Sequence, residues 1–386
     1  MSEGGIEGKL SSTPLVFYDY LSKENFIVNN ISGSIHAQNL NDQIQYQLNG
    51  NCLAPNQDNK EPVSFIIEGE ARNILMNETR TFSQTATWTN IPTSFISGIF
   101  PISPGVRAKL TSLAGPKIHV SIYNDFSGGE GPLTIKVDSE NLAAYFPLVL
   151  TEHAILLKED LTASLHINEE INKAFLREFN PLIAEGGAYS KHPISLRVNQ
   201  QNFYLPIKPY SFENFRLQSA SLDFGKIEIA NTGIMQDLFQ FLDVEAEQQR
   251  VESWFTPIFF SVQNGQIICK RFDALIDGRI RLALWGKTDI IRERLAMTLG
   301  IDPEFIKKLF RNTVLKTKNF FLIKIRGPIS SPEIDWSSAY ARIALLKSYT
   351  IAGPLNSLAD KLFSSLGEPT PPQTVSPLPW EVPESE

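Results

Sequence analysis

WFTPIFFSVQNGQIICKRFDALIDGRIRLALWGKTD (Trp254–Asp289) and NFFLIKIRGPISSPEIDW (Asn319–Trp336) are the two stretches that decide the fold of this 386-residue chain. Apolar and polar residues alternate within both, which predicts strands with one apolar and one polar face. An Asn-Gly pair at 264–265 and an Asp-Gly pair at 277–278 supply the positive φ angles that two-residue hairpin turns require. The pattern predicts five strands and contains no recognisable reaction centre.

The same alternation recurs upstream and predicts many further strands. They span residues 31–37, 43–50, 63–71, 81–89, 117–124, 132–139, 192–199, 202–207, 215–224 and 225–231, with two short strands around 158–160. Short helices are expected at 140–150, 169–185, 232–242, 288–300, 303–310, 337–349 and 355–367. Strand-then-helix units begin at Leu133, Ala163 and Lys226, a sign of internal repetition. We therefore expect a mainly β fold with short helices, in which repeated strand-strand-helix units build an elongated, curled antiparallel sheet.

Five segments follow from this pattern. They are a flexible N-terminal segment (1–25), a repeated β-region with short helices (26–253), a characteristic C-terminal region (254–336), amphipathic C-terminal helices (337–366) and a Pro-rich, acidic tail (367–386). The tail is expected to be disordered, with a short recognition segment around Leu378-Pro379-Trp380.

Composition excludes several classes of protein. Hydrophobic residues make up 42% of the chain and charged residues 20%, enough apolar content for a packed core. No run reaches the ~18 apolar residues of a membrane-spanning helix, and the first residues do not resemble a signal peptide. Cys52 and Cys269 are expected to be ordinary packed or surface cysteines, because they lie far apart and lack metal-ligand spacing.

The charge is unevenly distributed. The whole chain carries −7, but residues 250–326 hold 15 Lys and Arg against 7 Asp and Glu, which leaves −15 for the remainder. One interpretation is the solvated face of basic helices. The other is a surface that meets acidic lipid headgroups, formed by a helical insert (288–318) that acts as a plug or lid. Its candidate membrane-facing residues are Arg292, Arg294, Lys307, Lys308 and Arg311.

No catalytic or metal-binding pattern is evident. The five histidines do not have metal-ligand spacing, and no zinc-protease, serine-hydrolase or Walker-type motif occurs. Asp273 and Asp277 could form a carboxylate pair, but a turn at Asp277 is the simpler interpretation. Basic and aromatic residues interleave at 318–326, yet the acidic balance disfavours nucleic acid as a partner. We expect a protein without catalytic residues, metal or cofactor, other than bound phospholipid.

The apolar strand faces need a covering, and acyl chains could supply it. Exposing one row of Leu, Ile and Phe would cost many kcal/mol at about 25 cal/mol per Å². If the sheet curls into a taco-like apolar groove, its lining would include three residues from each of three strands. These groove candidates are Ile258, Phe260, Val262, Ile280, Leu282, Leu284, Phe321, Ile323 and Ile325.

Residues 259–289, a helical spacer and FLIKIRGPISSPEIDW together resemble the C-terminal signature of AsmA-like proteins of diderm bacterial envelopes. The matching positions are Asn264, Gly265, Gly286, Gly327, Pro332 and Asp335. The resemblance implies a groove that conducts phospholipids between the inner and outer membranes, usually held by an N-terminal anchor. This chain departs from the pattern because no anchor or export signal is visible in it, so it resembles a C-terminal portion or one half of a split protein.

The expected function is therefore that of a non-catalytic envelope protein on the periplasmic side of the inner membrane. It would hold or conduct phospholipid acyl chains, with phospholipids, the membrane surface, and an upstream anchored half or other envelope proteins as partners. The alternative is an assembly module that uses its sheet for contacts with other proteins. A glycan-active β-solenoid enzyme is a third, weaker interpretation.

Overall fold

The computed structural model describes residues 6–19, 24–39, 43–53, 63–76, 78–93, 111–174, 176–183, 187–207, 212–245, 248–309, 319–349, 371–374 and 376–382. Antiparallel strands dominate, with a few short helices, which confirms the predicted fold class at this level. The chain divides into two compact units. Unit 1 comprises residues 1–165 and 197–215, and unit 2 comprises residues 166–196 and 216–386. The predicted domain boundary at 253/254 lies inside unit 2.

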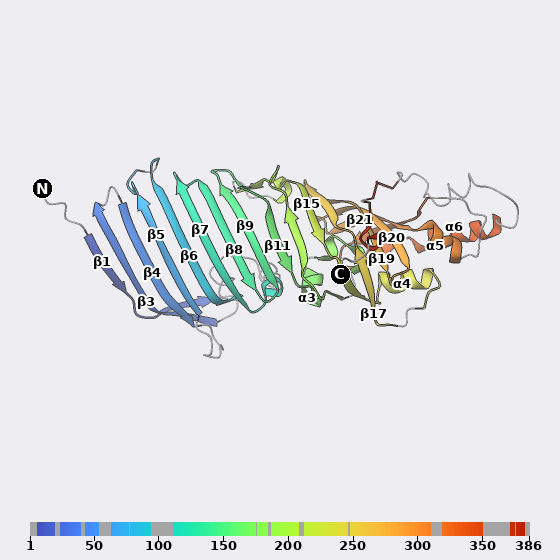
Figure 1. The fold of residues 1–386 in the computed structure, drawn as a ribbon, viewed down its shortest axis with the longest axis horizontal. Coiled ribbons are helices and arrows are strands. Elements are labelled where there is room, and N and C mark those ends of the chain that lie inside the picture. The colour runs from blue at the N-terminus through green and yellow to red at the C-terminus, as the bar shows by residue number, and fades with distance from the viewer. Residues whose placement is uncertain are drawn as a thin grey trace. The chain divides into compact units, whose positions relative to one another are not determined.

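Unit 1 is an open antiparallel sheet whose strands largely follow chain order, as the blue-to-green ribbon in Figure 1 shows. Its first strands are β1 (Ile6–Ser11), β2 (Leu15–Asp19), β3 (Glu24–Asn39), β4 (Gln43–Leu53) and β5 (Val63–Arg72). Then come β6 (Thr81–Pro92), β7 (Lys117–Ser127), β8 (Gly131–Ser139), β9 (Leu142–Leu150), β10 (Ala154–Leu157), β11 (Leu161–Leu165), β14 (Leu205–Pro206) and the 3-10 helix η3 (Phe212–Asn214).

Consecutive strands from β3 to β9 pair with each other, so unit 1 is a meander. At one side both β1 and β2 pair with the long β3. At the other side β10 and β11 both pair with β9. The prediction of a flexible N-terminus was wrong for residues 6–19, because β1 and β2 complete the hydrogen bonding of β3.

Unit 2 contains β12 (Ala188–Tyr189), β15 (Leu217–Asp223), β16 (Lys226–Ala230), β17 (Arg250–Phe255), β18 (Ile258–Gln263) and β19 (Gln266–Ile276). It continues with β20 (Ile280–Asp289), β21 (Arg294–Ile301), β22 (Phe321–Pro328) and β23 (Glu333–Ile334). The division between the units falls within β13 (Ile194–Val198). β19 is the central strand, since its first half pairs with β18 and its second half with β17, while β20 follows its other edge.

The two predicted hairpin turns are present in unit 2. Asn264 and Gly265 have φ angles of 52° and 69°, and Asp277 and Gly278 have 53° and 61°. Two consecutive positive φ angles define the turn that best matches the twist of a two-stranded ribbon. These turns bring β18, β19 and β20 together in sequence order, so Asp277 serves the turn.

Short helices accompany the sheet of unit 2. They are α3 (Glu169–Ala174), η1 (Leu176–Glu178), η2 (Pro181–Ile183), α4 (Ile234–Phe241), α5 (Pro303–Leu309), α6 (Trp336–Tyr349) and η4 (Pro379–Glu381). Predicted helices at 232–242, 303–310 and 337–349 are confirmed as α4, α5 and α6. The predicted helix at 169–185 is instead the short series α3, η1 and η2. The predicted helix at 355–367 lies outside the described residues.

Two helix predictions were wrong. Most of residues 140–150 belongs to β9 (Leu142–Leu150), which pairs with β8, β10 and β11. Residues 288–300 contain the end of β20, a turn and β21, which pairs with both β20 and β22. In each case the segment has apolar residues at alternate positions, and pairing with two neighbours outweighs its local helix propensity. One of the three predicted strand-helix repeats, the one beginning at Leu133, is therefore a strand pair.

Candidate functional site

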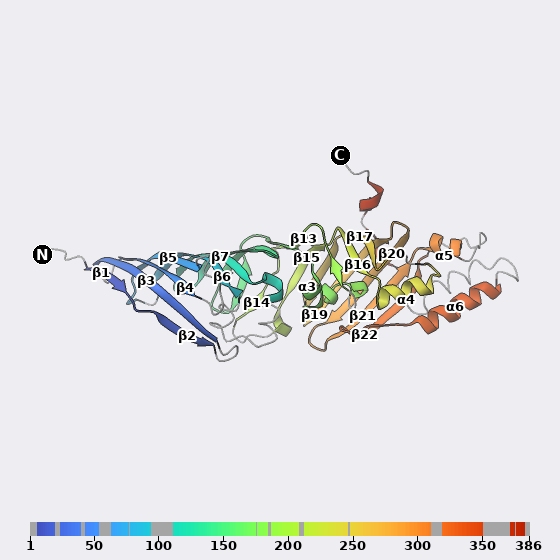
Figure 2. The same ribbon diagram turned by 90° about the horizontal axis from the view of Figure 1, so that it is seen from below.

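The nine groove candidates lie in the closed core of unit 2. Their exposed fractions are 0–5%, and they share one face of β18, β20 and β22. Phe241 of α4 stacks on Phe321 at 6.1 Å between ring centres, and Phe179 meets Phe260 at 4.8 Å. Figure 2 shows α4 and α6 beside the sheet. Phe241 of α4 covers part of this face, and all nine side chains are too deeply buried to offer an exposed surface to an acyl chain.

The secondary structure predicted for the basic insert was wrong in its first half, whereas its second predicted helix is α5. Arg292 lies in the β20–β21 turn and Arg294 begins β21, both exposed, whereas Lys307 lies on α5 beyond the other end of that strand. Eight residues of strand separate these sites by about 23 Å. Lys307 donates to Glu304 at 2.7 Å, with only 17% of its side chain exposed. The Lys308 side chain and Arg311 lie outside the described residues.

A partly open apolar face is found in unit 1. The registers of five strand pairs place six residues directly opposite one another across β4–β9, and we call them the apolar ladder. Its members are Leu48, Ile67, Ala86, Ile122, Ile135 and Phe146. Ala86 is fully buried, but the five larger side chains are only partly buried. This contrasts with the nine residues of unit 2, where packing is complete.

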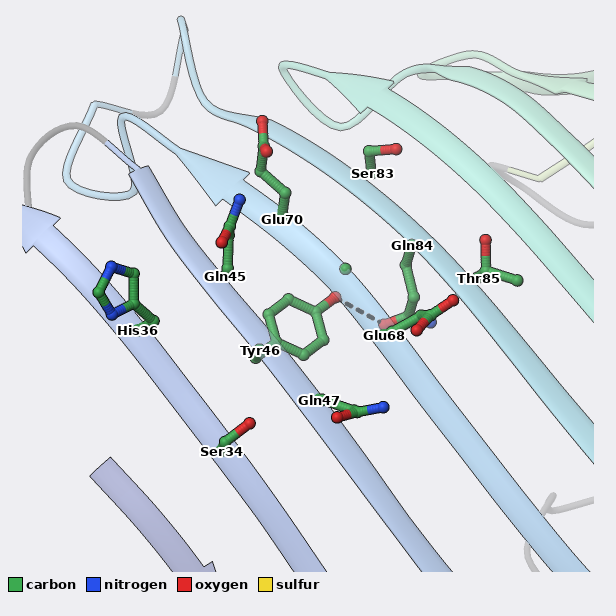
Figure 3. Close-up of a pocket in the computed structure, with 11 residues that line it drawn as sticks. Ser34, His36, Gln45, Tyr46, Gln47, Glu68, Glu70, Ser83, Gln84 and Thr85 are labelled. Atoms are coloured by element: carbon green, nitrogen blue, oxygen red, sulfur yellow. Dashed lines mark hydrogen bonds between the residues drawn. The ribbon is translucent and has the colours of Figure 1, made fainter. Parts of the chain in front are cut away.

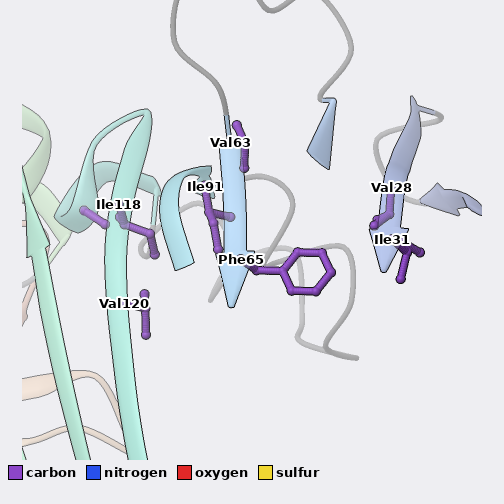
Figure 4. Close-up of a cluster of buried hydrophobic side chains, with 8 residues drawn as sticks. Val28, Ile31, Val63, Phe65, Ile91, Ile118 and Val120 are labelled. Carbon is purple, nitrogen blue, oxygen red and sulfur yellow. The ribbon is translucent and has the colours of Figure 1, made fainter. Parts of the chain in front are cut away.

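A buried cluster lies beside the ladder along the strand direction, on β3, β5, β6 and β7, and most of it is shown in Figure 4. The cluster comprises Val28, Ile31, Val63, Phe65, Ile91, Ala114, Ile118 and Val120. Leu48, Ile67, Ile122 and Ile135 of the ladder pack against it. The cluster covers one side of these four ladder residues, whose side chains nevertheless stay partly exposed.

A polar row crosses the same face on the other side of the ladder. Tyr46 reaches over β5, where its hydroxyl donates to the Gln84 side-chain oxygen at 2.9 Å (Figure 3). Burial raises the pKa of the Tyr46 hydroxyl above its ordinary value. Gly69 is required beneath the ring, since a Cβ there would lie 2.5 Å from the Tyr46 oxygen. Asn124 continues the row opposite Gln84 and donates to the Phe82 carbonyl at 3.3 Å.

The opposite face of β3–β6 is polar and forms a shallow depression of about 510 Å³ (Figure 3). Its side chains alternate with those of the ladder face, and they are Ser34, His36, Gln45, Gln47, Glu68, Glu70, Ser83 and Thr85. Arg72 holds the Glu70 carboxylate at 2.5 Å and lowers its pKa, and Gln43 donates to the same group. The sheet of unit 1 thus has one apolar and one hydrated face.

Other chemistry is not indicated in the described part of the chain. Within it, no three His, Cys, Asp or Glu residues are placed to hold one metal ion. Burial raises the pKa of the Cys269 thiol to about 12, so this cysteine is unreactive at neutral pH. None of the helices whose residues are described is long and apolar enough to cross a membrane. No protein-family model, curated protein or solved structure matches this chain.

Proposed function

We propose that unit 1 binds phospholipid acyl chains along the apolar ladder, as a non-catalytic lipid-binding protein of a bacterial cell envelope. The observation that carries the proposal is the row of six apolar side chains directly opposed across six strands, five of them partly exposed. Five spacings of about 4.8 Å give a row of about 24 Å. One leaflet of acyl chains spans about 15 Å, half of a ~30 Å bilayer core. The ladder is therefore long enough for one acyl chain.

The energetics favour such a ligand. Covering about 200 Å² of apolar surface would contribute about 5 kcal/mol at 25 cal/mol per Å². The headgroup would remain in water or contact the polar row of Tyr46, Gln84 and Asn124. Binding would be passive, with the lipid sliding across strands that present similar side chains. The periplasmic location, the membrane surface as partner and an anchored upstream half all rest on the AsmA-like resemblance.

Ile66 and Ile67 offer a matched pair for testing the proposal. They are neighbours in β5, but Ile67 belongs to the ladder and Ile66, 50% exposed, points to the hydrated face. Lipids extracted from the purified full chain would be identified by mass spectrometry. We expect phospholipid in the wild type and in Ile66→Asn, and at least a fivefold loss in Ile67→Asn. Absence of phospholipid from the wild type, together with no uptake of fluorescent lipid, would refute the proposal.

A second candidate function is assembly with another protein through the β1–β2 side of the sheet. Four apolar side chains are 44–61% exposed there, and they are Leu10, Leu15, Val16 and Tyr18. Exposed apolar edge strands pair readily with strands of other chains. Val16→Lys would abolish such a complex, as measured by sedimentation, while leaving bound lipid unchanged. Loss of lipid in this variant with the complex intact would contradict the assembly interpretation.

A further inference from the structure

The C-terminal segment, defined here as residues 371–382, folds back onto unit 2. It lies against the outer face, the side of β17, β19 and β20 that points away from the core. Asp273 belongs to this face because its neighbours in β19, Phe272 and Ala274, are fully buried in the core. Figure 2 shows η4 on the side of the sheet away from α4. The predicted disorder of the tail was therefore wrong for its described residues, 371–374 and 376–382.

Charged groups on the outer face hold the first part of the segment. The Asp273 carboxylate is fully buried and accepts hydrogen bonds from Arg271 at 2.7 and 3.1 Å. The Thr374 hydroxyl donates to the same carboxylate at 2.5 Å. Arg271 also donates to the Pro372 carbonyl at 3.1 Å. The Arg271–Asp273 ion pair thus binds both the Thr374 side chain and the Pro372 backbone carbonyl of the segment.

Apolar groups hold the second part. Leu378 is 2% exposed, and Trp380 meets Trp254 edge to face with ring centres 6.2 Å apart. The segment also has local order of its own, because the Glu381 carboxylate accepts from the Leu378 backbone N–H at 3.1 Å. A short polar anchor followed by a buried leucine and a tryptophan is how peptide ligands engage a recognition surface.

The outer face is built for this segment. A buried carboxylate is strongly unfavourable unless it is paired, and here Arg271 and Arg281 of the sheet and Thr374 of the segment supply the partners. The chain between Tyr349 and Pro371 is long enough to span about 70 Å when extended. Such a tether does not restrict the segment to its own unit 2. An identical face on a second copy presents the same Asp273, Arg271 and Trp254.

We propose that the outer face of unit 2 is a peptide-binding site, occupied in cis by the chain's own C-terminal segment and able to take the segment of a second copy. The first test uses the full chain with Leu378→Asp and Trp380→Ala, which weaken the resident segment without touching the sheet. A labelled peptide of residues 371–382 is titrated and its fluorescence anisotropy measured. We expect at least tenfold tighter binding to this variant than to the wild type, whose site is occupied.

Two controls make the result specific. A peptide with Thr374→Ala and Trp380→Ala should not bind, and full chain carrying Val382→Ser, at an exposed position of the segment, should behave as wild type. Circular dichroism confirms that the doubly substituted chain is folded. If that folded variant binds the peptide no better than the wild type does, the outer face is not a peptide site.

Exchange between copies is tested separately. The Leu378→Asp/Trp380→Ala variant, whose own segment binds the outer face weakly, carries an affinity tag. It is mixed with untagged wild-type chain and then purified by its tag. We expect more wild-type chain to co-purify with this variant than with a tagged wild type. The free peptide should reduce the amount of wild-type chain that co-purifies. Peptide binding without such recovery would overturn the second copy as partner. Neither result depends on bound lipid, so the proposed function of unit 1 is not at stake.

Discussion

The Leu282→Ala substitution tests whether the apolar face of unit 2 is a closed core or a lipid-binding groove. Leu282 is fully buried between Ala274 and Ile301, which lie opposite it on β19 and β21 and are themselves fully buried. Neighbours fixed in central strands cannot collapse into the space left by three carbons, so a cavity remains. Leu→Ala substitutions in such cores cost about 3 kcal/mol. A lipid groove would instead lose ligand and little stability.

Tryptophan fluorescence measures this cost in urea. Trp254, Trp285, Trp336 and Trp380 lie in unit 2, so a Trp88→Phe background makes the signal specific to it. With a slope of about 3 kcal/mol per M, a loss of 3 kcal/mol lowers the unfolding midpoint by about 1 M. Ile268→Ala, at a position 43% exposed on β19, should change it by less than ~0.2 M. Bound phospholipid should stay unchanged in both. Reduced lipid with an unchanged midpoint in Leu282→Ala would refute the closed core.

Three further predictions concern local contacts. Gly69→Ala should destabilise unit 1 by about 2 kcal/mol, because its Cβ would meet the Tyr46 oxygen and the Ser83 carbonyl at 2.5 Å. Thermal unfolding measures this loss, and a smaller loss in Gly69→Ala/Tyr46→Phe would identify the Tyr46 hydroxyl as the obstacle. Cys269, in a Cys52→Ser background, should react with a thiol reagent at pH 8 only after unfolding, since burial raises its pKa to about 12; fast labelling of folded protein would show that β19 opens. The Gln200 backbone N–H and Arg197 lower the pKa of Asp160, so its stabilising effect is present above pH 3.8 and is lost as pH falls through the lower folded pKa. Asp160→Asn should therefore reduce the urea midpoint at pH 6 and flatten its fall below pH 4, and an unaltered pH profile would contradict this.

Strands were the most predictable part of the fold. Residues 43–50 and 63–71 alternate so regularly that no other local structure would put their apolar side chains on one side, and both are strands. The Asn264-Gly265 and Asp277-Gly278 turns were predictable for an equally local reason, since both pairs tolerate positive φ.

Residues 288–300 show where local patterns fail. Arg294, Ala296 and Met297 favour helices, but Leu295, Met297 and Leu299 also alternate, and all three are buried in β21. Pairing with β20 and β22 decides between the two patterns, and partners distant in sequence cannot be identified from a single segment. The error placed Arg292 and Arg294 on a helix face, whereas Arg292 lies in the β20–β21 turn and Arg294 begins β21. The first of the two helices predicted for the basic insert is therefore absent, while the second is present as α5.

The location of the candidate site could not be predicted for a related reason. Alternation shows that Leu282 and Ile67 each lie on an apolar strand face, but it does not show what covers that face. In unit 2, Phe241 of α4 stacks on Phe321 of this face, and Leu238 of α4 and Leu182 of η2 are themselves fully or almost fully buried. In the described part of unit 1, residues 111–114 are helical and Ala114 packs in the buried cluster beside the ladder, but the five larger ladder side chains stay partly exposed. A sheet with its own helical cover needs no ligand, whereas one with a partly exposed apolar row gains free energy from any apolar partner. Cover, rather than strand pattern, is thus the property that points to unit 1 as the place where an acyl chain would bind.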